Sequence, residues 1–482
     1  MTEAPFQNTA EQDLILAAVR ETDSNLMLIA RAGGAKTTTL TLIARAVPSL
    51  SIGAFAFNKK NAIDLQSKMP PNATCATFNS VGHRAWAKML GGRKLILNDR
   101  KCMDIFKKLL EGLPLAEKEE LWADYSDVMD AVSAAKSLGF LPRQLHPSAR
   151  PLIRDAALFF LGFDVELSKL QEWAVLRIVE ESFKQALSGT IDYNDQLYMP
   201  AIMPVSFESY DLVMTDESQD LSPIQHAMLA KIVGRSRLIA VGDPCQAIYG
   251  FRGADEDSMP KLRQQFAMKE LFLTLCFRSS KEVVKNARWR APDMAYRPTA
   301  PEGSVTILET WDFSKLRPGD AIICRNNAPL FSLALSMLRA GLRPELLGGE
   351  ALKSLSTAMR KLGPKGMPQA EALEALRLWE EEKAKKYKSK DRARDMAACL
   401  RVFIDQSETL DGACALFERV ITQSGSIYLM SGHKSKGLEY DRVFFLDRHL
   451  LRKEGQDANL RYVIETRAKE DLFYVKSEGL VT

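Results

Sequence analysis

The segment "LMLIARAGGAKTTTL", residues 26–40, constrains the fold more than any other part of this chain. An apolar run of strand type leads through a turn of small residues into "KTTTLTLIARAV", which is predicted to be a helix with Leu40, Leu42 and Ile43 on one face. In a strand–turn–helix unit of this kind, backbone N–H groups and the helix N-terminus can surround phosphate oxygens. Lys36 would then neutralise the β- and γ-phosphates, and the Thr37 hydroxyl would bind Mg²⁺.

The loop departs from the usual phosphate-binding pattern at both outer glycine positions. Ala35 stands directly before the lysine, and Ala30 stands at the first glycine position. Glycine before the lysine lets the backbone approach phosphate closely, and a Cβ there can crowd it. Because turns rich in Ala and Gly are common, this segment alone leaves a chance match open as an alternative.

The other strand-like runs predict two doubly wound α/β units. Continuous apolar runs are typical of parallel strands that are buried on both faces, and helical segments lie between them. The first group contains "LMLIA", "SIGAFAFN", "ATCATF", "YDLVMTD" and "SRLIAVGD", and the second contains "SVTILET", "DAIICR", "SIYLMS" and "DRVFFLD". The predicted domains are residues 1–90 with 196–267 and residues 268–350 with 428–482, and mainly helical insertions are predicted at 91–195 and 351–427.

Composition limits the classes of protein to consider. With 46% hydrophobic and 26% charged residues among 482, the chain is predicted to be an ordinary globular protein of several domains. The excess of 65 basic over 61 acidic residues permits a nucleic-acid groove. The scattered cysteines and histidines have no metal-ligand or disulfide spacing. No apolar run is long enough to span a bilayer, so we expect no membrane partner and a cytoplasmic location, or a nuclear one in a eukaryote.

Two acidic residues follow a predicted buried strand in "YDLVMTDESQD". There Asp216 can hold the Mg²⁺ that Thr37 also binds, and Glu217 can orient an attacking water. In the next strand-and-loop segment, "LIAVGDPCQAIYGFRGAD", Gln246 could sense the γ-phosphate. A lone Asp–Glu pair is more often a solvated exit from a strand, but here it follows a candidate phosphate loop and a hydrophobic strand.

From "PFQNTAEQDLILAA" to "NLRYVIETRAKEDL", the ordered set of motifs resembles superfamily 1 DNA helicases of the UvrD/Rep/PcrA group, especially the compact F-box-helicase-like and phage-type members. The resemblance implies two RecA-like P-loop NTPase lobes with parallel sheets, each carrying a mainly helical insertion. It implies that Gln12 reads adenine, Phe277 stacks on it and Glu439 lies near the ribose. It also implies that Arg278 reaches the γ-phosphate and Arg467 is an arginine finger. The implied ATP-binding residues are Gln12, Ala30, Ala32, Gly33, Gly34, Ala35, Lys36, Thr37, Thr38, Phe277, Arg278, Gly437, Glu439 and Arg467.

The same resemblance implies a DNA-binding set. Phe251 is the strongest aromatic candidate, because it lies in a loop with glycine on both sides and next to Arg252. An aromatic residue at a strand end is more often part of the core, and this alternative stays open for Phe57. The implied DNA contacts are Phe57, Asn58, Phe78, Asn79, Tyr249, Phe251, Arg252, Arg325, Asn326, His433 and Lys436.

These observations predict an ATP- and Mg²⁺-dependent translocase on single-stranded DNA that unwinds duplex with 3′-to-5′ polarity. Its expected partners are single-stranded DNA, junctions of single- and double-stranded DNA, and replication or repair proteins. One alternative is a helicase-like DNA-binding protein whose ATPase is weak because of Ala35. A helicase–nuclease is disfavoured, because the sequence ends shortly after "ETRAKEDLFYVK".

Overall fold

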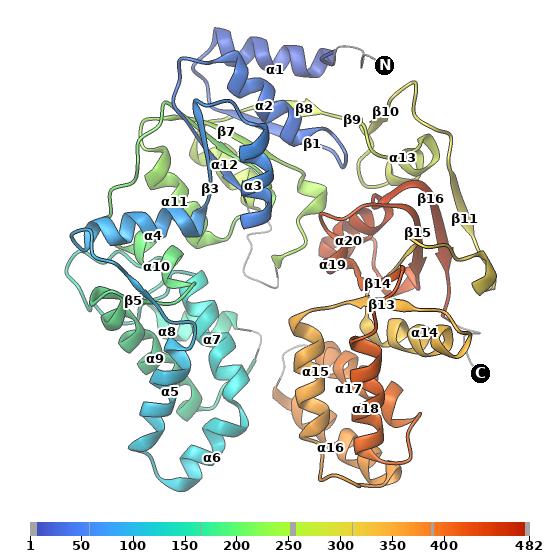
Figure 1. Cartoon of the computed structure of the whole chain (residues 1–482). Coiled ribbons are helices and arrows are strands. Elements are labelled where there is room, and N and C mark those ends of the chain that lie inside the picture. The colour runs from blue at the N-terminus through green and yellow to red at the C-terminus, as the bar shows by residue number, and fades with distance from the viewer. Residues whose placement is uncertain are drawn as a thin grey trace. The chain divides into compact units, whose positions relative to one another are not determined.

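The computed structural model describes residues 7–56, 58–163, 165–250, 257–310, 312–386 and 390–477 (Figure 1). Tertiary contacts divide the chain into two units, which are described separately. Unit 1 contains Met1–Ala30 and Ala35–Leu273, and unit 2 contains Arg31–Gly34 and Thr274–Thr482. Within the described ranges, no helix combines the length and apolar character needed to cross a bilayer.

Unit 1 is built on a six-stranded sheet in the order β3-β2-β6-β7-β1-β8. Every pairing in this sheet is parallel, as the continuous apolar runs predicted. All residues of β1 and β2 are buried, which is expected for strands covered on both faces. The strands are β1 Leu26–Ala30, β2 Ile52–Ala56, β3 Ala73–Thr77, β6 Leu212–Thr215, β7 Arg237–Gly242 and β8 Lys269–Leu273.

Alternate residues of the inner strands enter two different hydrophobic cores, as β1 shows. Leu26 and Leu28 pack with residues of α1, α2 and α3, whereas Met27 and Ile29 pack with residues of α4, α11 and α12. The sheet is therefore a middle layer between two sets of helices (Figure 1). These helices are α1 Ala10–Glu21, α2 Lys36–Ala46, α3 Lys59–Lys68, α4 Phe78–Met89, α11 Pro223–Val233 and α12 Ser258–Gln265.

A mainly helical segment lies between β3 and β6 in the sequence. Its apolar side chains belong to the same core cluster as Met27 and Ile29, so it is packed continuously with one face of the sheet. Its elements are β4 Ile96–Leu97, α5 Lys101–Glu111, α6 Leu115–Ala123, α7 Tyr125–Ser137, α8 Ala156–Gly162, α9 Lys169–Leu187, β5 Thr190–Ile191 and α10 Asp195–Ile202.

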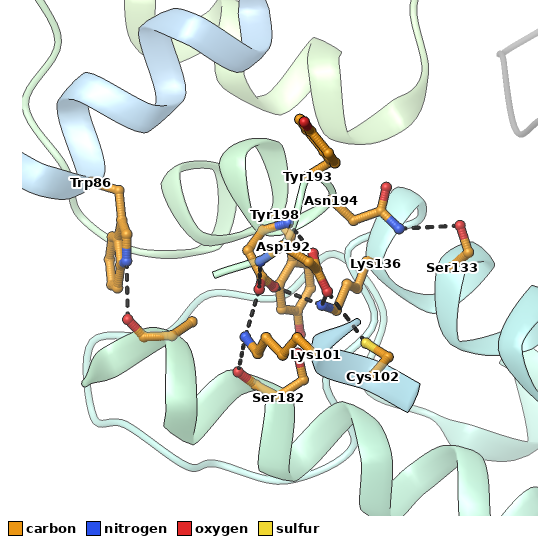
Figure 2. Close-up of polar contacts among 12 residues, drawn as sticks. Trp86, Lys101, Cys102, Ser133, Lys136, Ser182, Asp192, Tyr193, Asn194 and Tyr198 are labelled. Carbon is orange, nitrogen blue, oxygen red and sulfur yellow. Dashed lines mark hydrogen bonds and ion pairs between the residues drawn. The ribbon is translucent and has the colours of Figure 1, made fainter. Parts of the chain in front are cut away.

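This segment contains a buried network of two lysines and two aspartates (Figure 2). Lys101 Nζ lies 2.6 Å from Asp195 Oδ2, and Lys136 Nζ lies 2.5 Å from Asp192 Oδ2 and 2.8 Å from Asp195 Oδ1. Lys101 also donates to the Ser182 carbonyl at 2.7 Å. The network joins α5, α7 and α9 to the start of α10 and the turn before it, and its two positive charges match its two negative charges.

Unit 2 contains a second six-stranded parallel sheet, in the order β11-β16-β15-β12-β14-β13. Its main core cluster joins the sheet to α14–α18, with mutual ring contacts among Phe331, Phe403 and Phe417. The predicted α/β class, with parallel sheets and a mainly helical insertion in each unit, is confirmed. The strands are β11 Ser304–Ile307, β12 Ala321–Cys324, β13 Pro344–Leu347, β14 Ile427–Ser431, β15 Tyr440–Leu446 and β16 Ala468–Val475, with a separate pair β9 Leu275–Cys276 and β10 Ala295–Tyr296. The helices are α13 Lys281–Ala287, α14 Asn327–Arg339, α15 Glu350–Arg360, α16 Gln369–Lys386, α17 Lys390–Ile404, α18 Leu410–Ile421, α19 Gly432–Ser435 and α20 Gly455–Glu465.

Candidate nucleotide site and nucleic-acid interface

The candidate phosphate loop connects β1 to α2, and Lys36 is the first residue of that helix. Two residues of the loop have left-handed backbone conformations, Gly33 with φ 70° and Ala35 with φ 56°. Left-handed residues interspersed in a loop turn successive N–H groups toward a common point, which is how such loops bind anions. A residue with a Cβ costs roughly 1–2 kcal/mol in this conformation, so the position held by Ala35 favours glycine for a conformational reason.

Gln12 supports the start of α2 from α1. Its Nε2 donates to Thr39 Oγ1 at 3.1 Å, and its Oε1 accepts from the Thr9 backbone N–H at 3.0 Å. Thr39 Oγ1 in turn donates to the Ala35 carbonyl at 3.0 Å. Gln12 is only 1% exposed, so its side chain has a structural position between the two helices, and an adenine contact by Gln12 stays a prediction.

Lys36 meets one of the two acids that follow β6. Its Nζ lies 2.5 Å from Glu217 Oε1. Burial alone would lower the pKa of Lys36, but the nearby carboxylates of Glu217 and Asp216 outweigh burial and raise that pKa. Glu217 itself has a left-handed backbone, with φ 53°. The two motifs that the sequence predicted to cooperate are therefore brought together by the ends of β1 and β6.

Asp216 provides the carboxylate predicted to hold Mg²⁺. Burial, together with the adjacent Glu217 charge, raises the pKa of Asp216 to about 6. A carboxylate that is costly to ionise is stabilised by a bound cation. Carboxylate and hydroxyl oxygens are the hard ligands that Mg²⁺ prefers, so Asp216 and Thr37, the second residue of α2, fit the ion chemically.

A chain of hydrogen bonds connects Glu217 to Gln246. Gln219 Nε2 donates to Glu217 Oε2 at 2.5 Å, and Gln219 Oε1 accepts from the Asp243 N–H at 3.1 Å. Asp243 Oδ2 then accepts from Gln246 Nε2 at 2.7 Å. A Cβ on Gly242 would lie 2.5 Å from Gln219 Oε1, so only glycine admits this bridge. The bridging roles of Gln219 and Asp243 are not predicted from the sequence, although Asp243 directly follows β7 and Gln219 lies shortly after β6.

In unit 2, the predicted γ-phosphate and ribose residues contact each other. Arg278 Nε donates to Glu439 Oε2 at 2.6 Å. The ring of Phe277, the predicted adenine platform, lies 5.5 Å from the guanidinium of Arg297. Gly437, shortly before Glu439 in the sequence, has a left-handed backbone with φ 82°.

Arg467, the predicted arginine finger, is 1% exposed and lies two residues after α20. Its Nε donates to the Val463 carbonyl at 2.9 Å, and one terminal nitrogen donates to the Leu438 carbonyl at 3.1 Å. Several of its donors therefore already have uncharged acceptors, and its finger role stays a prediction.

Phe78, a predicted DNA contact, is buried in the core. Phe78 is 2% exposed, and its ring packs 5.5 Å from that of Phe55 in the core. Thr77 caps α4, and the first residue of that helix then points inward. This position favours the core alternative for an aromatic residue at a strand end, and a DNA contact by Phe78 stays a prediction. Asn58 caps α3 by accepting from the Asn61 N–H at 2.8 Å. Phe57, Phe251 and Arg252 lie outside the described residues.

Two other predicted DNA contacts, Asn79 and Tyr249, line one pocket of about 210 Å³ in unit 1. Lys136 and Asn194 also line it, which links the pocket to the buried lysine–aspartate network. Asn79 Nδ2 donates to the Tyr193 carbonyl at 3.1 Å. The Tyr193 side chain is 56% exposed and points away from the two lysines (Figure 2). Tyr193 is not among the predicted DNA contacts, and in the sequence it is an aromatic residue between polar ones in "IDYNDQ".

The predicted DNA contacts of unit 2 follow neighbouring strands. Arg325 and Asn326 come directly after β12, and His433 lies in α19, directly after β14. Since β12 and β14 pair in parallel, with Cys324 opposite Ser431, these residues lie at the same edge of the sheet. Arg325 Nε is 3.6 Å from Asp457 Oδ1, and Lys436 follows α19.

A parallel sheet, a left-handed loop before a helix that begins with lysine, and acids at the end of another strand of the same sheet together define a P-loop nucleotide-binding protein. Comparison with protein families is more specific. Residues 11–267 match the UvrD/REP helicase N-terminal domain, and the chain belongs to this family. The resemblance inferred from the motifs is confirmed.

Known proteins similar to this chain carry helicase names. It is 26% identical over 297 residues to F-box DNA helicase protein 1 of Schizosaccharomyces pombe, covering 58% of this chain and 32% of that protein. It is 23% identical over 305 residues to the putative ATP-dependent DNA helicase YjcD of Bacillus subtilis, covering 56% and 37%. It is 24% identical over 299 residues to DNA helicase II of Escherichia coli, covering 56% and 38%. The matched regions thus span about a third of these relatives' lengths.

Proposed function

We propose that this protein is an ATP-dependent DNA helicase that moves along single-stranded DNA. The observation that carries the proposal is the network Lys36–Glu217–Gln219–Asp243–Gln246, which gathers candidate groups for phosphate binding, water positioning and nucleotide sensing at the ends of three adjacent strands. Family membership and the names of the relatives support it.

In the proposed reaction, each residue has a separate task. In this reaction, Lys36 leaves Glu217 and binds the β- and γ-phosphates. Glu217 then binds a water molecule in place of Lys36 and orients it for attack. Asp216 and Thr37 hold Mg²⁺, which supplies charge neutralisation at the phosphates. Gln246 senses the γ-phosphate, and Arg278 and Arg467 add positive charge to the transition state.

The DNA substrate is proposed from the pocket in unit 1. Asn79 and Asn194 offer amide groups there, and Tyr249 offers an aromatic ring. Tyr193, whose backbone carbonyl accepts from Asn79, adds an exposed ring beside the pocket. Aromatic stacking with polar contacts suits unpaired bases, which expose both their faces and their edges. We propose 3′-to-5′ polarity, single-stranded DNA and single-/double-strand junctions as substrates, and replication or repair proteins as partners, from the family resemblance.

A second candidate function is a DNA-binding protein with a weak ATPase. The left-handed conformation of Ala35 favours it, because the energetic cost of that conformation acts directly on the phosphate loop.

ATP hydrolysis measured with and without single-stranded DNA tests these two candidates. We expect DNA to stimulate turnover, and we expect Glu217→Gln to bind ATP but lower turnover by at least about 100-fold, because it lacks the charge that orients water. Glu119→Gln, an exposed carboxylate in α6, is the matched control and should behave as wild type. Weak turnover that DNA does not stimulate would favour the second candidate. Wild-type turnover in Glu217→Gln would exclude Glu217 from the reaction. Partial duplexes with a 3′ or a 5′ tail then test the polarity.

A further inference from the structure

Arg31 is a charged residue inside the phosphate loop, and it forms a two-point ion pair with Asp293. Its Nε lies 2.8 Å from Asp293 Oδ1, and its second terminal nitrogen lies 2.9 Å from Asp293 Oδ2. The Arg31 side chain is 13% exposed and that of Asp293 is 37% exposed. Parallel N–H···O bonds of this kind fix the orientation of both side chains, in addition to pairing their charges.

The backbone of the same loop segment is held by further contacts within unit 2. The Ala32 N–H donates to the Tyr462 hydroxyl at 3.1 Å, and the Gly33 carbonyl accepts from the Phe277 N–H at 2.9 Å. A Cβ on Gly33 would lie 2.8 Å from both Arg278 Cβ and Cys276 Sγ, so the backbone is tightly packed there. Arg31–Gly34 is accordingly grouped with unit 2, directly before Ala35 and the start of α2.

We propose that Arg31 and Asp293 are positioning residues for the ATP site: their ion pair holds the phosphate loop in the conformation that receives phosphate. This inference rests on the proposed ATP-binding function. Ala35 pays a conformational cost that glycine would avoid, so the loop benefits from an outside contact that selects its left-handed form. A contact that orders the loop beforehand lowers the ordering cost of binding and thereby raises affinity. Since Arg31 directs two of its nitrogens to Asp293, it acts through the loop backbone and not as a phosphate ligand.

The test is a double-mutant cycle of Arg31→Met, Asp293→Asn and both together, with the affinity of a fluorescent ATP analogue as the readout. We expect each single variant to bind about 3- to 10-fold more weakly, within the range of a partly exposed two-point ion pair. The double variant should be no weaker than the weaker single one, because both changes remove one interaction. At saturating ATP, kcat should stay within about 2-fold of wild type. Arg31→Lys should have an intermediate ATP affinity, because lysine keeps the positive charge but cannot form the two-point pair.

The matched control is the pair Lys281–Glu302 of unit 2, at 3.0 Å, where Lys281→Met should leave ATP affinity unchanged. High salt should narrow the difference in ATP affinity between wild type and Asp293→Asn.

If Arg31→Met weakens ATP binding but Asp293→Asn does not, Arg31 contacts the nucleotide itself and the inference is overturned. Unchanged affinity in both single variants also overturns it, while leaving the proposed function standing. Thermal unfolding is measured for every variant. If Asp293→Asn weakens ATP binding and Arg31→Lys does not weaken it at all, the loss in Asp293→Asn comes from general destabilisation and not from the ion pair. A wild-type protein that fails to bind ATP would instead refute the proposed function.

Discussion

At the scale of single residues, the candidate site is marked by backbone conformation. Only four described residues other than glycine have a positive φ, and two of them, Ala35 and Glu217, belong to the candidate nucleotide site. Side chains with a Cβ disfavour this region, so such residues persist where the surrounding structure holds them. The Ala35 carbonyl accepts a hydrogen bond from Thr39, and the Glu217 carboxylate accepts hydrogen bonds from Lys36 and Gln219. The alanine that departs from the sequence pattern is therefore a strained member of an ordered site.

Replacing Ala35 with glycine should strengthen nucleotide binding. The change removes roughly 1–2 kcal/mol of left-handed strain, and the greater freedom of glycine in other conformations offsets part of this gain, by about 0.4–1 kcal/mol. We expect ATP to bind about 2- to 5-fold more tightly in an equilibrium titration, with unchanged DNA affinity in the absence of nucleotide. Ala32→Gly is the control, since Ala32 has no positive φ and should gain nothing. Equal or weaker ATP affinity in Ala35→Gly would mean that the loop has adapted to alanine.

At the scale of elements, the strands that carry the site were the most predictable part of the fold. The strands β1, β6 and β7 are buried on both faces, and their continuous apolar runs were recognised. The strand β8 was not recognised, because as an edge strand it exposes several of its side chains and its sequence "KELFL" is mixed. The strands β13 and β16 were missed as well, and both have interrupted burial.

Contacts that depend on distant partners could not be predicted. Lys101 and Lys136 occur in helical segments, where a lysine normally indicates a solvated face. Their partner Asp195 is 94 and 59 residues away in the sequence. In the same way, nothing local distinguishes the buried Phe78 from the exposed Tyr193.

Removing one cation from the buried network should strongly destabilise unit 1. Lys136→Met leaves Asp192 without its 2.5 Å partner and Asp195 with Lys101 alone. Breaking a buried ion pair from one side costs about 3–5 kcal/mol, because a charge stays buried without compensation. Denaturant unfolding should show this loss. Lys184→Met, at an exposed ion pair of 3.8 Å, should change the free energy of unfolding by less than about 0.5 kcal/mol.

The pH dependence of this loss has a definite sign. Burial alone would raise the pKa of Asp192, but Lys136 outweighs burial and lowers that pKa below its ordinary value of 3.8. A depressed carboxyl pKa contributes stability that is present above the unfolded pKa and lost as the pH falls through the folded one. The difference in the free energy of unfolding between wild type and Lys136→Met should therefore be largest at neutral pH and should shrink below about pH 4. A difference that stays constant down to pH 2 would contradict the charge-pairing explanation.

At the scale of the whole molecule, the two units place their candidate ligand residues by the same rule. In unit 1, Asp216 and Asp243 follow the parallel strands β6 and β7, and in unit 2, Arg325 and His433 follow β12 and β14. Ligands of open α/β sheets bind at the carboxyl ends of the strands. The helical segment of unit 1 adds Tyr193 and Asn194, which the buried network holds beside Asn79. The proposed helicase function requires that a DNA contact at these residues be coupled to ATP turnover.

Tyr193→Ala tests whether this surface carries the DNA strand. One stacked base contributes roughly 1–3 kcal/mol, so single-stranded DNA should bind about 5- to 150-fold more weakly. Turnover without DNA should not change, because Tyr193 belongs to neither the phosphate loop nor the acidic motif. The DNA concentration for half-maximal stimulation should rise by a similar factor, and strand separation should fall with it. Phe272→Ala is the control, because this exposed aromatic residue lies on the edge strand β8 and should leave DNA affinity unchanged. If Tyr193 served only in packing, its removal would lower thermal stability and impair turnover even without DNA. A stable Tyr193→Ala protein that binds and unwinds DNA like wild type would place the strand elsewhere.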